Sequence, residues 1–192
     1  MEEAINHCKK GIDIFKWAST NEGKNPDIVL ACAGDTPSLE VLACASILKE
    51  KVPNLKVRVV NVVDLMKLES SNKHPHGLTD EEYNKIFTKD KPILFAFHGY
   101  PNVIHELTYN RENTNLHVRG YIEEGSITTP FDMRVQNKID RYHLILDVIK
   151  YVPKLQKNKD LKEYAETMLE KHKKTVTKEG HEIKEVNSWR WK

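Results

Sequence analysis

The chain has 192 residues, enough for one α/β domain with its own core and short extensions but not for two full domains. Thirty basic and 28 acidic residues leave a formal net charge of +2, so charge indicates neither a nucleic acid nor an anionic membrane as a partner. No apolar stretch reaches the roughly 20 residues that cross a bilayer, and the start, MEEAINHCKKG, lacks the apolar region of a signal peptide.

Cysteine usage bears on the redox compartment. The three cysteines, Cys8, Cys32 and Cys44, form an odd set without paired spacing, and the last two fall within predicted core elements. This pattern favours buried thiols in a reducing cytoplasm over secreted disulfides. We therefore expect a soluble, cytoplasmic protein.

Residues 1–25 are expected to form a linker that leads into the domain, with a short amphipathic segment followed by the polar stretch 19–25. Residues 26–64 then have the pattern of a complete β-α-β crossover. Its two apolar runs, 28–33 and 57–63, are typical of parallel strands covered on both faces.

The helix of this crossover has recognisable ends. Thr36 can cap it, and Pro37, with its preset φ and missing N–H, fits the first helical position. We expect Glu40 to lie off the apolar stripe, and residues 52–54 to end the helix. The stripe is formed by Leu39, Leu42, Ala43 and Ile47.

The middle of the chain alternates between polar loops and buried elements. Residues 66–91 form a long polar loop, in which Thr79 can cap a short helix over 80–87. A third buried strand is predicted over 93–97, followed by a helix. The alternating pattern of 116–121 indicates a short edge or antiparallel strand.

The last third of the chain is strongly helical. Pro130 opens a helix that is expected to run to Val152, where Pro153 stops it, and to pack on the sheet. Residues 154–178 form a further amphipathic helix that closes near Gly180. The final WRWK contains two tryptophans, which should dock on this chain or on a partner.

These elements predict a three-layer α/β fold with a mostly parallel sheet of about five strands and helices on both faces. We divide the chain into the lead-in segment 1–25, the α/β domain 26–153, and a carboxyl-terminal amphipathic helix with a docking tail, 154–192.

Open α/β sheets bind ligands outside the carboxyl ends of their strands. Here those ends carry Gly34, Asp35, Thr36, His98 and Tyr100, which define a candidate anion pocket. A helix that starts at Thr36 would offer free N–H groups to an anion, and His98 could act as a base or a donor. A structural explanation is also open, in which Gly34 makes the turn, Asp35 and Thr36 cap the helix and His98 satisfies a strand end.

Several known motifs can be tested against the sequence. The turn ACAGDTPS has a single glycine, and the chain contains neither G-x-G-x-x-G nor G-x-x-x-x-G-K-[ST], so dinucleotide and P-loop binding are unsupported. His74 and His76 have a spacing that can chelate zinc, but no further ligand is identifiable, which favours structural or solvent-facing histidines. Cys32 lies inside a strand, where a thiol is usually inert.

Charged residues between the fourth strand and the next helix give weaker signals. Paired-carboxylate catalysis by residues 123–124 and Asp132 is one interpretation, but the pattern favours a solvated face or a cap. Arg111, Arg119 and Arg134 could contact phosphate or carboxylate groups, but such arginines more often form interface or surface ion pairs.

A set of longer strings, in a fixed order, resembles the carboxyl-terminal domain of phosphoketolase. The lead-in HCKKGIDIFKWAS resembles the linker to the preceding domain, and WRWK also fits, so the resemblance covers nearly the whole chain. The other strings are ACAGDTPSLE, VRVVNVVDLMKL, HPHGLTDEEYNKIF, FAFHGYPNVIHELTYNR, NLHVRGYIEEG and TTPFDMRVQNKIDRYHL.

The resemblance implies a lyase of the transketolase superfamily that depends on thiamine diphosphate and Mg²⁺. Such enzymes cleave xylulose 5-phosphate, and often fructose 6-phosphate, with inorganic phosphate to acetyl phosphate and an aldose phosphate. In this family the first domain holds the diphosphate and metal, and the second contacts the aminopyrimidine ring across a dimer interface. The third, which this chain resembles, lies outside the active-site cleft.

The resemblance assigns no catalytic, cofactor-binding or metal-binding residue to this chain. No metal-diphosphate motif of the G-D-G type and no cofactor-activating glutamate can be matched to any position. It implies that the partners are the cofactor-binding domains of the same enzyme, within a homo-oligomer, and that the chain has a structural, assembly or regulatory role. It leaves open whether the chain is a natural fragment or a split-enzyme subunit. The alternative hypothesis is a stand-alone regulatory module that binds an anionic metabolite.

Overall fold

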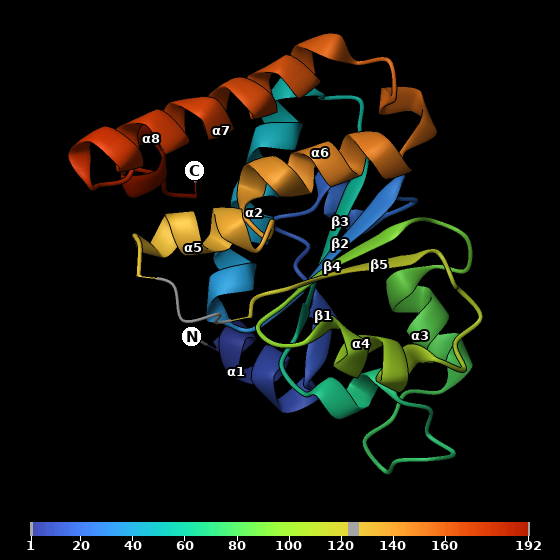
Figure 1. The fold of residues 1–192 in the computed structure, drawn as a ribbon. Coiled ribbons are helices and arrows are strands. Elements are labelled where there is room, and N and C mark those ends of the chain that lie inside the picture. The colour runs from blue at the N-terminus through green and yellow to red at the C-terminus, as the bar shows by residue number, and fades with distance from the viewer. Residues whose placement is uncertain (1, 123–126, 192) are drawn as a thin grey trace.

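The computed structural model describes residues 2–122 and 127–191, which contain one five-stranded sheet (Figure 1). The strand order is β1-β3-β2-β4-β5, and only the β1–β3 pairing is antiparallel. The strands are β1 (Ile12–Ile14), β2 (Ile28–Ala33), β3 (Val57–Val62), β4 (Ile93–Phe97) and β5 (Leu116–Gly120).

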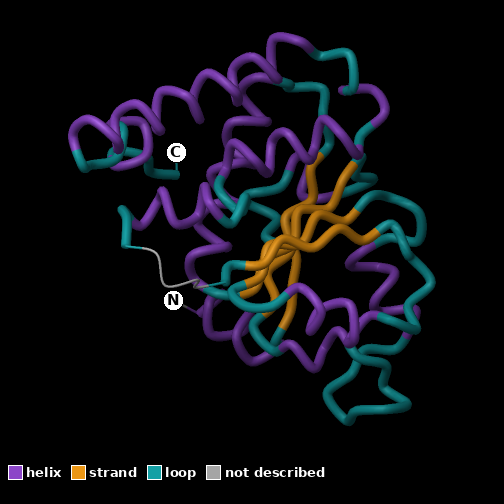
Figure 2. The backbone as a smooth tube through the Cα atoms, in the orientation of Figure 1, coloured by secondary structure: helices purple, strands orange, loops and turns teal. Residues whose placement is uncertain are grey.

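Helices cover both faces of this sheet (Figures 1 and 2). The α-helices are α1 (Glu2–Lys10), α2 (Asp35–Lys51), α3 (Asp80–Phe87), α4 (Pro101–Thr108), α5 (Pro130–Gln136), α6 (Arg141–Tyr151), α7 (Lys159–Glu179) and α8 (Lys184–Asn187). Short 3-10 turns lie at Thr20–Gly23, Leu65–Leu68 and Pro153–Leu155.

Alternate residues of the strands enter two separate cores. In β2, Leu30 and Cys32 pack with residues of α2 and α6, whereas Val29 and Ala31 pack with residues of α3 and α4. This follows from the period of two in a strand, whose successive side chains point to opposite faces. All six residues of β2 are buried because both faces are covered. The predicted three-layer, mostly parallel α/β fold is confirmed.

The lead-in segment contributes to the sheet. β1 pairs antiparallel with β3, with Ile12 opposite Val62, and the ring Nε2 of His7 in α1 lies 2.8 Å from Oδ1 of Asn61 in β3. A strand of three residues is too short to give a recognisable sequence pattern, and it was not predicted. The division of the chain at residue 25 stays a prediction.

The start of α2 differs from the prediction. The helix begins at Asp35 with Gly34 as its N-cap, and Thr36 is already helical, so the prediction of Thr36 as the cap is wrong. Pro37 then lies in the first turn, where its missing N–H would have had no intrahelical partner. The helix ends at Lys51, as the sequence indicated.

The prediction that Glu40 lies off the buried face of α2 is also wrong. Its side chain is 0% exposed and accepts hydrogen bonds from two arginines, Arg141 on α6 and Arg134 on α5. Leu39, placed on the apolar stripe from its spacing, is 39% exposed instead. The buried face is therefore rotated toward Glu40, because the ion pairs compensate the cost of burying its charge.

The single helix predicted from Pro130 to Val152 is in fact two helices. α5 ends at Gln136, and Lys138 adopts a left-handed conformation with φ of 55°. Asp140 then caps α6, with its Oδ1 accepting from the backbone N–H groups of residues 142 and 143. Asp140 thus starts a new helix, since a side chain that binds free N–H groups at a helix start stabilises the break.

The last long helix, predicted over residues 154–178, starts later than expected: a 3-10 turn occupies Pro153–Leu155, and Asn158 caps a helix that begins at Lys159. The other helix ends agree with the sequence. Thr79 caps α3 in a capping box with Glu82, and Gly180 ends α7 in a left-handed conformation. α7 lies outside α6, on the side away from the sheet (Figure 1).

The two tail tryptophans dock on this chain. The ring of Trp191 packs edge-on against the ring of Trp17, with centroids 5.0 Å apart, and both tail rings are half-buried. Across the described ranges no helix has the length and apolarity that a membrane crossing requires.

The cysteine environments generate a labelling prediction. Cys32 and Cys44 are buried, and burial raises the pKa of both thiols, whereas Cys8 on α1 is exposed. The expectation of buried thiols is thus wrong for Cys8. Titration of the native chain at pH 8 with a thiol-specific reagent should modify one cysteine rapidly, and all three after denaturation in guanidinium chloride, because the thiolate is the reactive form. A Cys8→Ser variant should lose the rapid phase, and rapid labelling that persists in this variant would contradict the packing of β2 and α2.

Candidate functional site

The carboxyl ends of β2 and β4 bring four of the five predicted site residues together. The backbone N–H of His98 donates to the carbonyl of Ala33 at 3.0 Å, which places His98 beside the turn of Gly34. The ring Nδ1 of His98 lies 3.2 Å from Oδ1 of Asp35. The sequence prediction that these strand ends converge is borne out by these contacts, because parallel strands end at the same edge of a sheet.

Gly34 is required by the close approach of the two strand ends. Its φ is +100°, a conformation that side chains other than glycine rarely adopt, and a Cβ there would lie 2.5 Å from the Cβ of His98. The turn between β2 and α2 can therefore be this tight only with glycine.

Asp35 occupies the start of α2. Its Oδ1 accepts from the backbone N–H of Thr36 at 2.6 Å, and this hydrogen bond, with that to His98, lowers the pKa of the carboxyl group. The side chain is 88% exposed, so the Asp35–His98 contact is an open surface pair rather than an enclosed dyad. An anion approaching this helix start would meet a carboxylate, which is the group that already interacts with the N-terminal N–H groups.

Tyr100 lies at the same edge but in a different setting. It is the N-cap of α4, its side chain makes no cap hydrogen bond, and it is 62% exposed. The ring that packs against His98 is instead Tyr121, edge-on with centroids 5.0 Å apart. Tyr121 was not predicted as a site residue, because only the pairing of β5 with β4 brings it to this edge.

The neighbouring histidines do not form a metal site. The ring Nδ1 of His76 lies 2.8 Å from Oδ2 of Asp64, and His74 accepts a hydrogen bond from the backbone of His76. Among residues 2–122 and 127–191, no group of three or more His, Cys, Asp or Glu side chains is placed to hold a metal ion. The two histidines therefore lack the further ligands that zinc needs.

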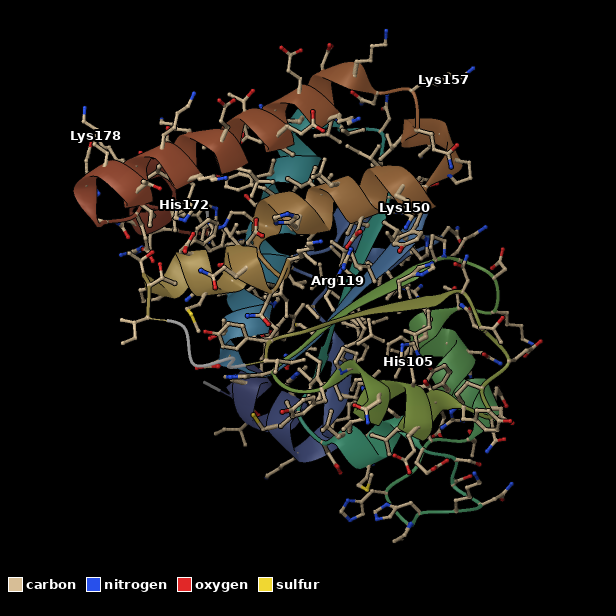
Figure 3. All side chains as sticks on the ribbon, viewed as in Figure 1. His105, Arg119, Lys150, Lys157, His172 and Lys178 are labelled. Carbon is tan, nitrogen blue, oxygen red and sulfur yellow. The ribbon has the colours of Figure 1, made fainter. Side chains whose placement is uncertain are left out.

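The other polar residues singled out from the sequence have structural partners. Asp132 on α5 accepts hydrogen bonds from the side chains of Thr128 and Gln136. Its Oδ1 lies 3.3 Å from Nε2 of the buried His172 on α7 (Figure 3). Residues 123–124 lie outside the described residues.

All three arginines considered from the sequence have carboxylate partners. Arg119 on β5 forms a bidentate pair with Asp147 on α6, with both distances 2.7 Å (Figure 3). Arg111 is bound by Asp80 and by backbone carbonyls, and its side chain is only 2% exposed. Arg111 thus forms an ion pair, as expected, but its own side chain is buried rather than at the surface.

The charged group that the sequence reasoning missed is the Glu40 cluster, which we define as Glu40, Arg134 and Arg141. Arg141 donates to Glu40 from its backbone N–H and from Nε, both at 2.9 Å, and Arg134 donates from Nη1 at 2.7 Å. Burial lowers the pKa of Arg141, but the hydrogen bond to Glu40 and the attraction of the Glu40 charge together raise it above its ordinary value. The only sequence signal was an acidic residue within an otherwise apolar helix segment.

The geometry of the β2–α2 turn generates a stability prediction. Gly34→Ala should lower the free energy of unfolding by about 2 kcal/mol, because the new Cβ meets His98 and the backbone is strained. Gly180→Ala is the matched control, since Gly180 also has positive φ, 70°, but open space around it, and should cost about 1 kcal/mol. Urea denaturation of both variants measures the difference, and equal losses would contradict the close approach.

Comparison with known proteins extends these observations. The model of the family described as XFP C-terminal domain matches residues 1–191. Among curated proteins, "Probable phosphoketolase" of Clostridium acetobutylicum is 52% identical over 192 residues, and "Probable phosphoketolase" of Chlorobaculum tepidum is 54% identical over 195 residues. "Probable phosphoketolase 2" of Nostoc sp. is 53% identical over 193 residues. Each alignment covers 100% of this chain and 24% of the relative, so the chain spans about a quarter of their length.

Among solved structures, a chain described as "Split gene transketolase, inactive beta4 tetramer" aligns with a TM-score of 0.48 and 14% identity, covering 70% of this chain and 42% of that chain. A similarity at this level carries no inference about function. The family match and the curated relatives, in contrast, show the family: the chain belongs to the XFP C-terminal domain family, the carboxyl-terminal domain of phosphoketolases.

Proposed function

We propose that this chain is the carboxyl-terminal domain of a thiamine diphosphate-dependent phosphoketolase. The reaction is the cleavage of xylulose 5-phosphate or fructose 6-phosphate with inorganic phosphate to acetyl phosphate and an aldose phosphate. The observation that supports the proposal is identity of 52–54% along the whole chain to proteins of which it spans 24%. The three free thiols are consistent with a cytoplasmic enzyme.

The described residues do not fit the cofactor. Thiamine diphosphate is held through Mg²⁺, which needs oxygen ligands from carboxylates and from the diphosphate. The described part of the chain contains no suitable group of ligands, and the α2 start presents the Asp35 carboxylate where a diphosphate would need N–H groups. The proposal therefore assigns the cofactor and the metal to the remaining three quarters of the enzyme, and no catalytic step to this chain.

The role left for this domain is assembly, and its carboxyl edge has the composition of a docking surface. Val63 directly after β3 is 51% exposed, Tyr100 after β4 is 62% exposed, and Leu39 near the start of α2 is 39% exposed. Apolar and aromatic side chains grouped with polar neighbours are typical of protein interfaces. We assign this surface to contact with the cofactor-binding domains of the same enzyme, which assembles as a homo-oligomer.

The alternative of a stand-alone regulatory module that binds an anionic metabolite between Gly34 and Tyr100 stays a prediction. The carboxylate of Asp35 at the start of α2 argues against it, because an anion placed there would be repelled.

The proposal can be tested by producing this chain and the rest of the enzyme as separate polypeptides. The 192-residue chain alone, with thiamine diphosphate, Mg²⁺ and xylulose 5-phosphate, should form no acetyl phosphate, and the two polypeptides should associate. Tyr100→Glu should weaken their association by about 2 kcal/mol, or roughly thirtyfold, as expected for a buried aromatic anchor. Calorimetric titration of one polypeptide with the other measures the affinity.

Tyr109→Glu is the matched control. Tyr109 lies at the opposite end of the same helix, α4, is 83% exposed, and should leave the affinity unchanged. Turnover by the isolated chain would overturn the assembly role, and equal effects of the two tyrosine variants would overturn the assignment of the surface.

A further inference from the structure

A polar pocket of about 610 Å³ lies at the edge of the sheet opposite to Asp35 and His98. It is formed where β2, β3 and β4 begin and where α3 ends. Five basic side chains line it, against two carboxylates. The basic residues are Lys56, Arg58, Lys85, Lys89 and Lys91.

Arg58 is the fixed cation of this pocket. Its Nε donates to the carbonyl of Gly23 at 2.7 Å, and its Nη1 donates to the carbonyls of Lys85 and Ile86 at 2.9 and 2.7 Å. The residue is only 8% exposed, but Nη2 is neither hydrogen-bonded within the described residues nor enclosed. Three carbonyls thus hold the guanidinium and leave one nitrogen free for a ligand.

The charge of Arg58 is not balanced by a carboxylate. Within the described part of the chain no Asp or Glu oxygen lies within 4.0 Å of its guanidinium. Burial removes water from the charged form and thereby lowers the pKa of Arg58. Carbonyl oxygens satisfy hydrogen bonds but carry no net charge, so an anion that reaches Nη2 would gain the full electrostatic attraction.

The surrounding charges reinforce this attraction only in part. Asp27 is bound by the N–H of Lys56 at 2.7 Å and by Lys154 at 2.6 Å, and Asp90 pairs with Lys91 at 2.9 Å. The Nζ of Lys56 has no carboxylate partner in the described ranges and remains available. The other two lysines form exposed pairs, Lys85 with Glu81 and Lys89 with Glu112. Such exposed pairs are weak and can rearrange around a ligand.

The same pocket contains an acceptor that lacks a donor. The side chain of Asn84 on α3 donates from Nδ2 to Glu112 at 3.0 Å, but its Oδ1 is buried and has no partner among the described residues. A buried acceptor left without a donor is costly, so it favours a ligand that brings a hydroxyl group.

We propose that this pocket binds a small phosphate monoester that carries a hydroxyl group, with the phosphate at Arg58 and Lys56 and the hydroxyl at Asn84. Arginine and lysine supply the charge and directed N–H groups that recognise phosphate, and Asn84 Oδ1 accepts from the hydroxyl. The site does not depend on the proposed phosphoketolase function, because its residues lie at the opposite edge of the sheet from the surface assigned to docking.

The test is titration of the 192-residue chain with glycerol 2-phosphate, and separately with inorganic phosphate, followed by NMR of ¹⁵N-labelled protein at constant ionic strength. Saturable shifts are expected at Lys56, Arg58 and Asn84, and glycerol 2-phosphate should bind more tightly than inorganic phosphate. Lys56→Gln should weaken binding of both by about fivefold, the effect of removing one charge at an exposed site.

Two control variants make the test specific. Lys178→Gln should leave both affinities unchanged, because Lys178 is an exposed lysine in the last turn of α7 (Figure 3) and does not line this pocket. Asn84→Ala should remove the preference for glycerol 2-phosphate while inorganic phosphate still binds. Equal weakening by the two lysine variants, shifts centred on Asp35 and His98, or no saturable shift at all would each overturn the proposal.

Discussion

The Glu40 cluster determines how the carboxyl-terminal half of this protein packs onto the sheet. Glu40 on α2 is fully buried, and its carboxylate binds Arg141 at the start of α6 and Arg134 on α5. An unpaired buried charge is strongly destabilising, so α5 and α6 must lie where their arginines reach Glu40. The ring of Trp189 lies 5.3 Å from the Arg141 guanidinium, so the same cluster also positions the tail.

This constraint explains which features the sequence could predict. β2, β3 and β4 were predicted correctly because strands covered on both faces are continuous apolar runs. The burial of Glu40 could not be predicted, because its partner Arg141 lies 101 residues away and local periodicity assigns an acidic residue to the solvent face. The break at Asp140 was missed for a related reason, since a cap inside a helical pattern looks like a residue of the polar face.

For the candidate site, the sequence predicted which residues meet but not how they interact. The meeting of Gly34, Asp35 and His98 follows from the rule that parallel strands end at one edge, and this needs no knowledge of side-chain partners. Whether the site would attract or repel an anion was not predictable, because this depends on the position of the Asp35 carboxylate, which hydrogen-bonds to the backbone N–H of Thr36. The two edges of the sheet therefore differ: one exposes apolar and aromatic side chains, and the other presents Arg58 and polar atoms without partners among the described residues.

A double-mutant cycle between Glu40 and Arg141 tests most directly whether the buried cluster holds the fold. Urea denaturation should give a loss of about 3–5 kcal/mol for Glu40→Gln and a comparable loss for Arg141→Met, because each leaves a buried partner uncompensated. The double variant should lose far less than the sum, with a coupling energy of about 2–3 kcal/mol. Losses that add to within about 0.5 kcal/mol would contradict the account.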